Sequence, residues 1–134
     1  MPNVKEGVHR ISLRGQSVTL LPDARVVLLP DGFEPTQDWE VKRSGKYYTI
    51  RQPRADQYIG YDDTPDLYEP LTAGPKKQEW LLLDGPEGTI TLAVPPDKSP
   101  TPLTLGLSPV LIFPPMLALS EPFRIDEGWK FRPA

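Results

Sequence analysis

Apolar and polar residues alternate along short stretches of this chain, and three of these stretches begin at a glycine. Each carries two apolar or aromatic side chains two residues apart, which places both on one face of a β-strand. The stretches are residues 7–13, 45–50 and 88–92, and the paired positions are His9 and Ile11, Tyr48 and Ile50, and Ile90 and Leu92. The pattern predicts three equivalent strands with matched inward-facing side chains.

The three tryptophans mark a second kind of strand and set the length of a repeat. Each stands two residues after Gln or Glu and two residues before an apolar side chain, in motifs that begin at Gln37, Gln78 and Glu127. The tryptophans are 41 and 49 residues apart in a chain of 134 residues. A spacing close to one third of the chain indicates three pseudo-repeats.

Two more candidate strands, bounded by proline or glycine, lie between the glycine strand and the tryptophan strand of each repeat. They are residues 17–21 and 26–29 in the first repeat, 58–61 and 67–71 in the second, and 103–107 and 110–113 in the third. Four strands in each of three repeats give about twelve, which predicts an all-β protein with the β-trefoil fold in a single domain over residues 1–134. A β-sandwich is the rival all-β fold, but nothing in a sandwich requires a repeat in thirds.

One segment, residues 114–122, does not fit the repeat and is interpreted as an insertion before the last strand. Its apolar part, residues 116–119, is a candidate partner surface or a plug of the core, and we favour the plug. Composition supports the strand-rich reading, because 18 prolines leave little room for long helices. With 38% apolar residues the chain has material for one core, and without cysteine it has no disulfide.

The charge balance narrows the classes of partner. Fifteen basic and eighteen acidic residues give a net charge of −3, without the basic surface that nucleic acid requires. No window approaches 18 consecutive apolar residues, so we expect neither a membrane-spanning segment nor a membrane partner. The first residues, Met1-Pro2-Asn3-Val4, are not apolar enough for a signal peptide, so we expect a cytoplasmic protein and a monomer.

The residue inventory argues against an enzyme. There is no cysteine, and the single histidine, His9, occupies an inward strand position that favours a structural role. The acidic run at residues 62–66 lacks the glycine and the final glutamate of a calcium loop and is interpreted as a solvated hairpin tip. We therefore expect no metal and no cofactor. The Gln-x-Trp motif resembles the repeat of ricin-B-type trefoil lectins, in which such residues mostly hold the core together.

Exposed loops are the remaining candidates for function, and arginines stand at two proline-flanked turns. One is the segment Pro22, Asp23, Ala24, Arg25 and Val26, which joins the second and third predicted strands. The other is Pro53, Arg54 and Ala55, between the first two strands of the second repeat.

The chain resembles the small mushroom β-trefoil serine protease inhibitors of the cospin and cnispin type. The resemblance rests on the first glycine strand, the Leu-Pro-x-x-Arg-Val-x-x-Leu-Pro segment, the Trp-Glu-Val and Glu-Trp-Leu-Leu strands and the proline-rich third repeat. It implies inhibition of a trypsin-like protease by a basic residue in the loop between the second and third strands. The matching residue is Arg25, followed by Val26. If that loop is a tight turn, another loop must bind the protease, and Arg54 is the second candidate.

Two further functions stay open. The related mycocypins inhibit papain-like and legumain-like cysteine proteases, but the connection at residues 14–16 is short for a papain cleft. Legumain requires asparagine, and the single one is Asn3. A β-trefoil lectin that binds glycans is the alternative from a different class, and a trefoil scaffold for an unrelated protein partner is a third.

Overall fold

The computed structural model describes residues 4–32, 36–110, 113–121 and 128–134. Within these residues the chain forms twelve β-strands and one short 3₁₀ turn, η1, at Pro86–Gly88. The strands of the first half are β1 (Gly7–Leu13), β2 (Gln16–Leu20), β3 (Val26–Leu29), β4 (Trp39–Ser44), β5 (Tyr47–Gln52) and β6 (Gln57–Gly60). Those of the second half are β7 (Thr72–Gly74), β8 (Leu81–Asp84), β9 (Ile90–Ala93), β10 (Thr104–Leu107), β11 (Leu117–Ser120) and β12 (Lys130–Pro133).

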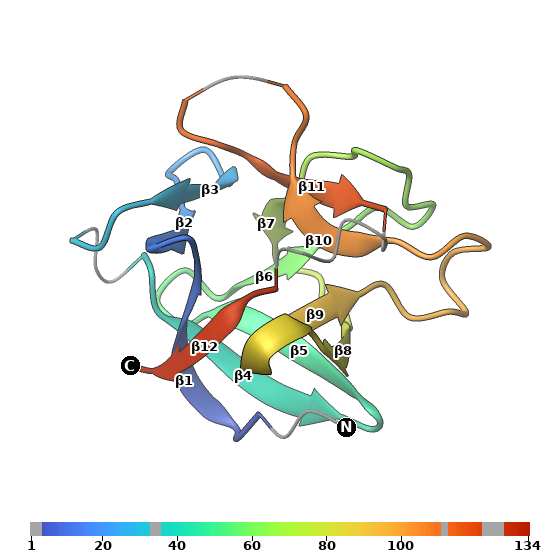
Figure 1. Cartoon of the computed structure of the whole chain (residues 1–134), viewed down its shortest axis with the longest axis horizontal. Helices are drawn as coiled ribbons and strands as arrows, with labels where there is room; N and C mark the ends of the chain where they lie inside the picture. Colours follow the sequence, from blue (N-terminus) through green and yellow to red (C-terminus); the bar gives the residue numbers. More distant parts are fainter. Residues whose placement is uncertain (1–3, 33–35, 111–112, 122–127) are drawn as a thin grey trace.

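Six of the strands form a barrel and the other six form three hairpins that cap it (Figure 1). In the barrel, β1 pairs with β4 and β12, β4 pairs with β5, and β8 pairs with β9, all antiparallel. Single bridges from Tyr48 to Trp80 and from Ile90 to Trp129 connect the remaining neighbours. The hairpins β2–β3, β6–β7 and β10–β11 are joined to one another by the bridges Arg25–Thr72, Val27–Met116 and Pro70–Ala118. This architecture is a β-trefoil, so the predicted fold is confirmed.

The three tryptophans hold the cap to the barrel in the same way in each repeat. Their side chains are buried, and each indole N–H donates to a backbone carbonyl in the middle of the first hairpin strand. The bonds run from Trp39 to Val18 at 2.9 Å, from Trp80 to Ile59 at 3.1 Å and from Trp129 to Leu105 at 3.0 Å. Residues at equal offsets from these carbonyls are therefore counterparts in the three repeats.

The predicted inward positions are also equivalent. His9 pairs with Trp39, and the counterpart bridges join Tyr48 to Trp80 and Ile90 to Trp129. His9 is buried, lies 3.1 Å through Nδ1 from the Gly7 carbonyl oxygen and packs edge-on against the Phe131 ring. It therefore occupies the structural position that the sequence predicted.

The second strand of two hairpins was predicted in the wrong place. In the second repeat the strand is Thr72–Gly74 instead of residues 67–71, because Tyr68 adopts a positive φ of 65° and Pro70 has no N–H for a ladder. In the third repeat it is Leu117–Ser120, because Leu107 pairs with Leu117.

These registers change the interpretation of two proline-rich segments. The expected strand at 110–113 has Val110 and Phe113 exposed at its ends, and residues 111–112 lie outside the described residues. The expected insertion at 114–122 contains β11, whose side chains Leu117 and Leu119 are fully buried. Residues 117–119 thus belong to the core, as the plug interpretation predicted, but as part of the repeat.

Candidate functional site

The connections within the three cap hairpins are counterparts in position and differ in chemistry. The β2–β3 connection is a short turn that contains Arg25. The β6–β7 connection, residues 61–71, is acidic, and the β10–β11 connection, residues 108–116, is apolar. A repeated barrel that holds three unlike loops makes these loops candidates for specific binding.

The turn around Arg25 is tight and locked by its own hydrogen bonds. The Ala24 N–H donates to the Leu21 carbonyl and the Leu21 N–H to the Arg25 carbonyl, both at 2.9 Å, and Ala24 has a φ of 74°. The Arg25 Nε lies 2.7 Å from Asp23 Oδ2. The backbone N–H of Arg25, and then its guanidinium, hold the pKa of Asp23 below its ordinary value. The guanidinium is thus paired through Nε within the turn, while the Arg25 side chain stays 44% exposed.

The flanking backbone ties this turn to the next hairpin. The Ala73 N–H donates to the Ala24 carbonyl at 2.9 Å, Arg25 bridges Thr72, and the Val26 side chain is fully buried. A protease-binding loop is extended and accessible on both sides of the reactive bond, whereas this segment is a tight turn, exposed at Asp23 and Arg25 and buried at Val26. The predicted reactive loop Pro22, Asp23, Ala24, Arg25 and Val26 therefore forms a tight turn with an exposed arginine at its edge, and its role in protease binding stays a prediction.

The second candidate arginine, Arg54, stands in the exposed turn between β5 and β6. The Ala55 N–H donates to the Gln52 side-chain oxygen at 2.7 Å, and Asp56, at a φ of 53°, pairs with Arg51 at 2.7 Å. Arg54 itself is exposed, and within the described part of the chain it has no hydrogen bond or ion pair. The turn thus presents an unpaired guanidinium from a fixed base, preceded by the half-buried Pro53.

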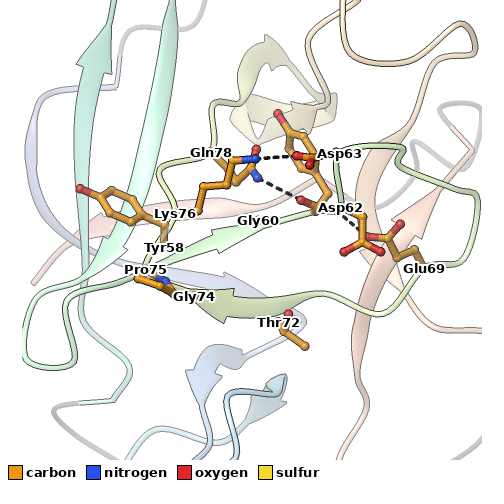
Figure 2. A pocket seen from close by; sticks show the side chains of 11 residues that line it. Tyr58, Gly60, Asp62, Asp63, Glu69, Thr72, Gly74, Pro75, Lys76 and Gln78 are labelled. Carbon is orange, nitrogen blue, oxygen red and sulfur yellow. Dashed lines mark hydrogen bonds and ion pairs between the residues drawn. The ribbon is translucent and has the colours of Figure 1, made fainter.

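A polar cavity of about 280 Å³ opens beside the β6–β7 hairpin (Figure 2). Its volume is near the lower end of the roughly 300–1,000 Å³ typical of small-molecule sites. Its walls come from β6, from the acidic connection, from β7 and from the segment that leads to Trp80. The lining residues are Tyr58, Gly60, Tyr61, Asp62, Asp63, Glu69, Thr72, Gly74, Pro75, Lys76 and Gln78. We call this cavity the acidic pocket.

The carboxylates of the acidic pocket have different partners. Glu69 accepts hydrogen bonds from the backbone N–H groups of Asp62 at 2.9 Å and Asp66 at 3.2 Å, which orders the connection. Asp63 pairs with Lys76 at 2.5 Å, and that ammonium group holds the pKa of Asp63 below its ordinary value. The Asp62 carboxylate is exposed and accepts no hydrogen bond from another described residue. It is the acceptor left for a ligand.

The floor of the acidic pocket is connected to the core. Gln78 lies against Gly60, where an added Cβ would come within 2.5 Å of its Cγ, and its Nε2 donates to the Tyr61 carbonyl at 3.1 Å. The Tyr61 hydroxyl donates to the Glu79 carbonyl at 2.5 Å, and its ring stands edge-on to Trp80. Burial raises the pKa of Tyr61, so this hydroxyl stays a donor. The floor is therefore rigid.

Two adjacent aspartates, Asp62 and Asp63, occur in the second repeat and are absent at the corresponding positions of the other two. Counted from the carbonyls that accept the indole bonds, Asp62 and Asp63 correspond to Leu21 and Pro22 in the first repeat and to Ser108 and Pro109 in the third. The counterpart of Gln78 in the first repeat, Gln37, is fully buried and donates to Thr19 Oγ1 at 3.1 Å and to the Pro30 carbonyl at 2.8 Å. In the first repeat this glutamine therefore has a purely architectural role.

Sequence reasoning missed the acidic pocket. The acidic run at residues 62–66 was interpreted as a solvated hairpin tip. A signal was present in the sequence, because the residues that correspond to Asp62 and Asp63 in the other two repeats are uncharged. Among the described residues no group of three potential metal ligands is placed to hold an ion. A search of the same residues finds no helix with the length and apolar character needed to cross a membrane.

Comparison with known proteins supports the fold and little beyond it. No protein-family model matches the chain, and no curated protein matches it in sequence. A ricin B-like lectin of Macrolepiota procera in complex with lactose is similar, with a TM-score of 0.78, 19% identity and 100% of both chains covered. The designed threefold-symmetric protein ThreeFoil has a TM-score of 0.76 and 12% identity, over 96% of this chain and 100% of its own.

A third similar structure is SeviL bound to the asialo-GM1 saccharide. It has a TM-score of 0.71 and 17% identity, over 97% of this chain and 99% of its own. At such identities the likeness shows the class of fold, so this is a β-trefoil protein, similar in structure to ricin B-like lectins. The comparisons support the trefoil part of the expected family resemblance and show no protease-inhibitor family.

Proposed function

We propose that the protein is a carbohydrate-binding protein and that a sugar occupies the acidic pocket. The observation that carries the proposal is the Asp62 carboxylate, exposed on a preordered connection and without a hydrogen-bond donor among the described residues. Sugar hydroxyls are neutral donors, and a carboxylate that accepts them forms charge-assisted hydrogen bonds. Two structures that share the fold, the ricin B-like lectin of Macrolepiota procera and SeviL, are bound to lactose and to asialo-GM1 saccharide, which supports the same ligand class.

The other groups of the acidic pocket suit a sugar ring. Lys76 offers N–H donors to ring or hydroxyl oxygens, and Thr72 is exposed at the rim. Figure 2 shows Tyr58 at the opposite end of the acidic pocket from Asp62 and Glu69. An aromatic face at one end and carboxylates at the other match a sugar, which has an apolar C–H face and polar edges.

A glycan array followed by calorimetry with the best ligand tests this proposal. Replacing Asp62 by Ala removes a charged acceptor worth about 1.5–3 kcal/mol, so the Kd should rise about 10–150-fold. Asp66→Ala is the matched control, because this exposed aspartate is on the same connection and its side chain does not line the pocket. Absence of any bound glycan at micromolar protein, or equal affinity of the Asp62 variant and the wild type, would refute the proposal.

Inhibition of a trypsin-like serine protease is the second candidate function, and the unpaired Arg54 is the observation that favours it. A guanidinium on a fixed turn can enter a specificity pocket that ends in a carboxylate. Titration of bovine trypsin with the wild type, Arg54→Ala and Arg25→Ala distinguishes the sites. Inhibition lost only with the Arg54 variant, and slow cleavage after Arg54, would support this function. No inhibition by micromolar wild type would exclude it.

A further inference from the structure

The β10–β11 connection carries the most exposed large apolar side chains that the structure describes. Phe113 is 82% exposed and Val110 is 60% exposed, whereas the other large exposed hydrophobics, Val8, Leu67 and Leu83, are each at 40%. In Figure 1 the described parts of this connection, on either side of residues 111–112, extend beyond the strands of the cap at the top of the view. We call Pro109, Val110, Phe113 and Pro114 the apolar tip. Exposed apolar residues gathered at one place mark an interaction surface.

The apolar tip is held outward by a fixed base. The Ser108 N–H donates to the Met116 carbonyl at 2.8 Å, and Leu107 pairs with Leu117 at the end of the ladder. The Leu28 N–H of the neighbouring hairpin donates to the Pro115 carbonyl at 2.9 Å. Prolines on both sides further restrict the backbone. Because the base is already ordered, binding through the tip costs little conformational entropy.

Charge distribution indicates what the apolar tip contacts. No charged residue occurs between Lys98 and Glu121, so both strands of this hairpin and the connection between them are uncharged. A segment that enters a lipid interface must avoid ionised side chains, whose transfer to hydrocarbon is costly. The net charge of −3 disfavours anionic lipid surfaces and leaves neutral, zwitterionic ones.

We propose that the apolar tip inserts into the interface of a neutral lipid bilayer and holds the protein at a membrane surface. Two exposed apolar side chains on a projecting tip bury far less than the roughly 800 Å² per partner of a stable protein interface. A fluid bilayer adapts to a projecting tip and accepts a few apolar side chains without a preformed pocket. This proposal departs from the expectation of no membrane partner, which rested on the lack of an apolar window long enough to span a bilayer, because a peripheral contact needs no such window. The inference is independent of the proposed glycan binding.

The tip can be given its own fluorescent reporter because the native tryptophans Trp39, Trp80 and Trp129 are buried in the core. Phe113→Trp places an indole at the tip, and Leu83→Trp, at an exposed site on β8, is the matched control. On titration with phosphatidylcholine vesicles that contain no glycolipid, emission of the Phe113 variant should shift to shorter wavelength. A quencher attached at a shallow depth in the lipid should then reduce it. The control spectrum should not change.

Sedimentation with the same vesicles measures the partition of the unlabelled protein. Phe113→Ser should lower the partition coefficient about tenfold or more, and thermal unfolding should be unchanged because the side chain is mostly exposed. Leu83→Ser should bind as the wild type does. Three results would overturn the proposal: no spectral shift up to millimolar lipid, a requirement for anionic lipid, or a shift without lipid that grows with protein concentration. The last would identify a second copy as the partner.

Discussion

The three equivalent indole bonds predict that three single substitutions have nearly the same effect on stability. Replacing Trp39, Trp80 or Trp129 by Phe keeps an aromatic ring in the core and removes the N–H donor. Each substitution leaves one buried backbone carbonyl without its partner and shortens one side chain that fills the barrel. Since the surroundings repeat, the losses in unfolding free energy should be alike in the three variants.

The magnitude follows from two contributions. A buried carbonyl left unsatisfied costs about 1–3 kcal/mol. A residual cavity of roughly 40 Å³, at about 24 cal/mol per Å³, adds about 1 kcal/mol. The sum is about 2–4 kcal/mol per variant. With an unfolding entropy of roughly 2.1 cal/mol/K per residue over 134 residues, this corresponds to a decrease in Tm of about 7–14 °C.

Urea unfolding and thermal melts followed by circular dichroism measure these losses. Tyr47→Phe is the control, because this half-buried tyrosine is outside the three indole bonds, and it should change stability by less than about 0.5 kcal/mol. The reasoning fails if any tryptophan variant loses less than about 1 kcal/mol. It also fails if the three losses differ by more than about 1.5 kcal/mol, because the repeats would then not be energetically equivalent.

Two further predictions concern the acidic pocket. Gly60→Ala places a Cβ within 2.5 Å of the Gln78 Cγ, so Gln78 must shift and glycan binding should weaken at least about tenfold. Gly106→Ala is the control: its Cβ would meet the Ser120 Cβ at 2.7 Å, outside the acidic pocket, so the Kd should be unchanged in calorimetry. Lys76→Gln removes the cation that lowers the pKa of Asp63, so NMR titration of this carboxyl should give a pKa closer to its ordinary value of 3.8. In the wild type the stabilisation from this pair is present above pH 3.8 and is lost as pH falls through the lowered pKa; an unchanged pKa in the variant would contradict this account.

The barrel and its repeat could be predicted from the sequence because the repeated residues are the ones that pack. Alternation identified β1, β5 and β9, and the tryptophan spacing gave the three repeats. The errors concern β7 and β11, which are strands of three and four residues. In both cases the prediction chose a nearby apolar segment, residues 67–71 and 110–113, instead. The position of a short strand is decided by its register with the partner strand, and the apolar periodicity of a single segment gives no information on that register.

The candidate site was harder to predict, because its residues are defined by loop geometry. Arg25 was singled out by its flanking prolines, but the positive φ of Ala24 and the Asp23 pair depend on a turn that spacing alone does not reveal. Asp62 and Asp63 were visible as charges, yet their assembly with Gln78 requires Gly60 on one strand and the order imposed by Glu69. A site whose residues come from several strands and loops can be identified only when the positions of these elements in space are known.

The departures from threefold symmetry are where function has to be sought in this fold. Positions that hold the repeats together carry the same interaction three times, as in the indole bonds, and are fixed by packing. The counterpart pairs Leu21–Pro22, Asp62–Asp63 and Ser108–Pro109 lie outside these three bonds and differ between the repeats: they belong to a locked turn, a polar pocket and the start of an apolar tip. A β-trefoil protein less than 20% identical to this chain has the same packing requirements but need not have the same residues in these loops. Ligand tests that vary only these pairs, on an unchanged barrel, therefore separate the function of this chain from the fold it has in common with lectins.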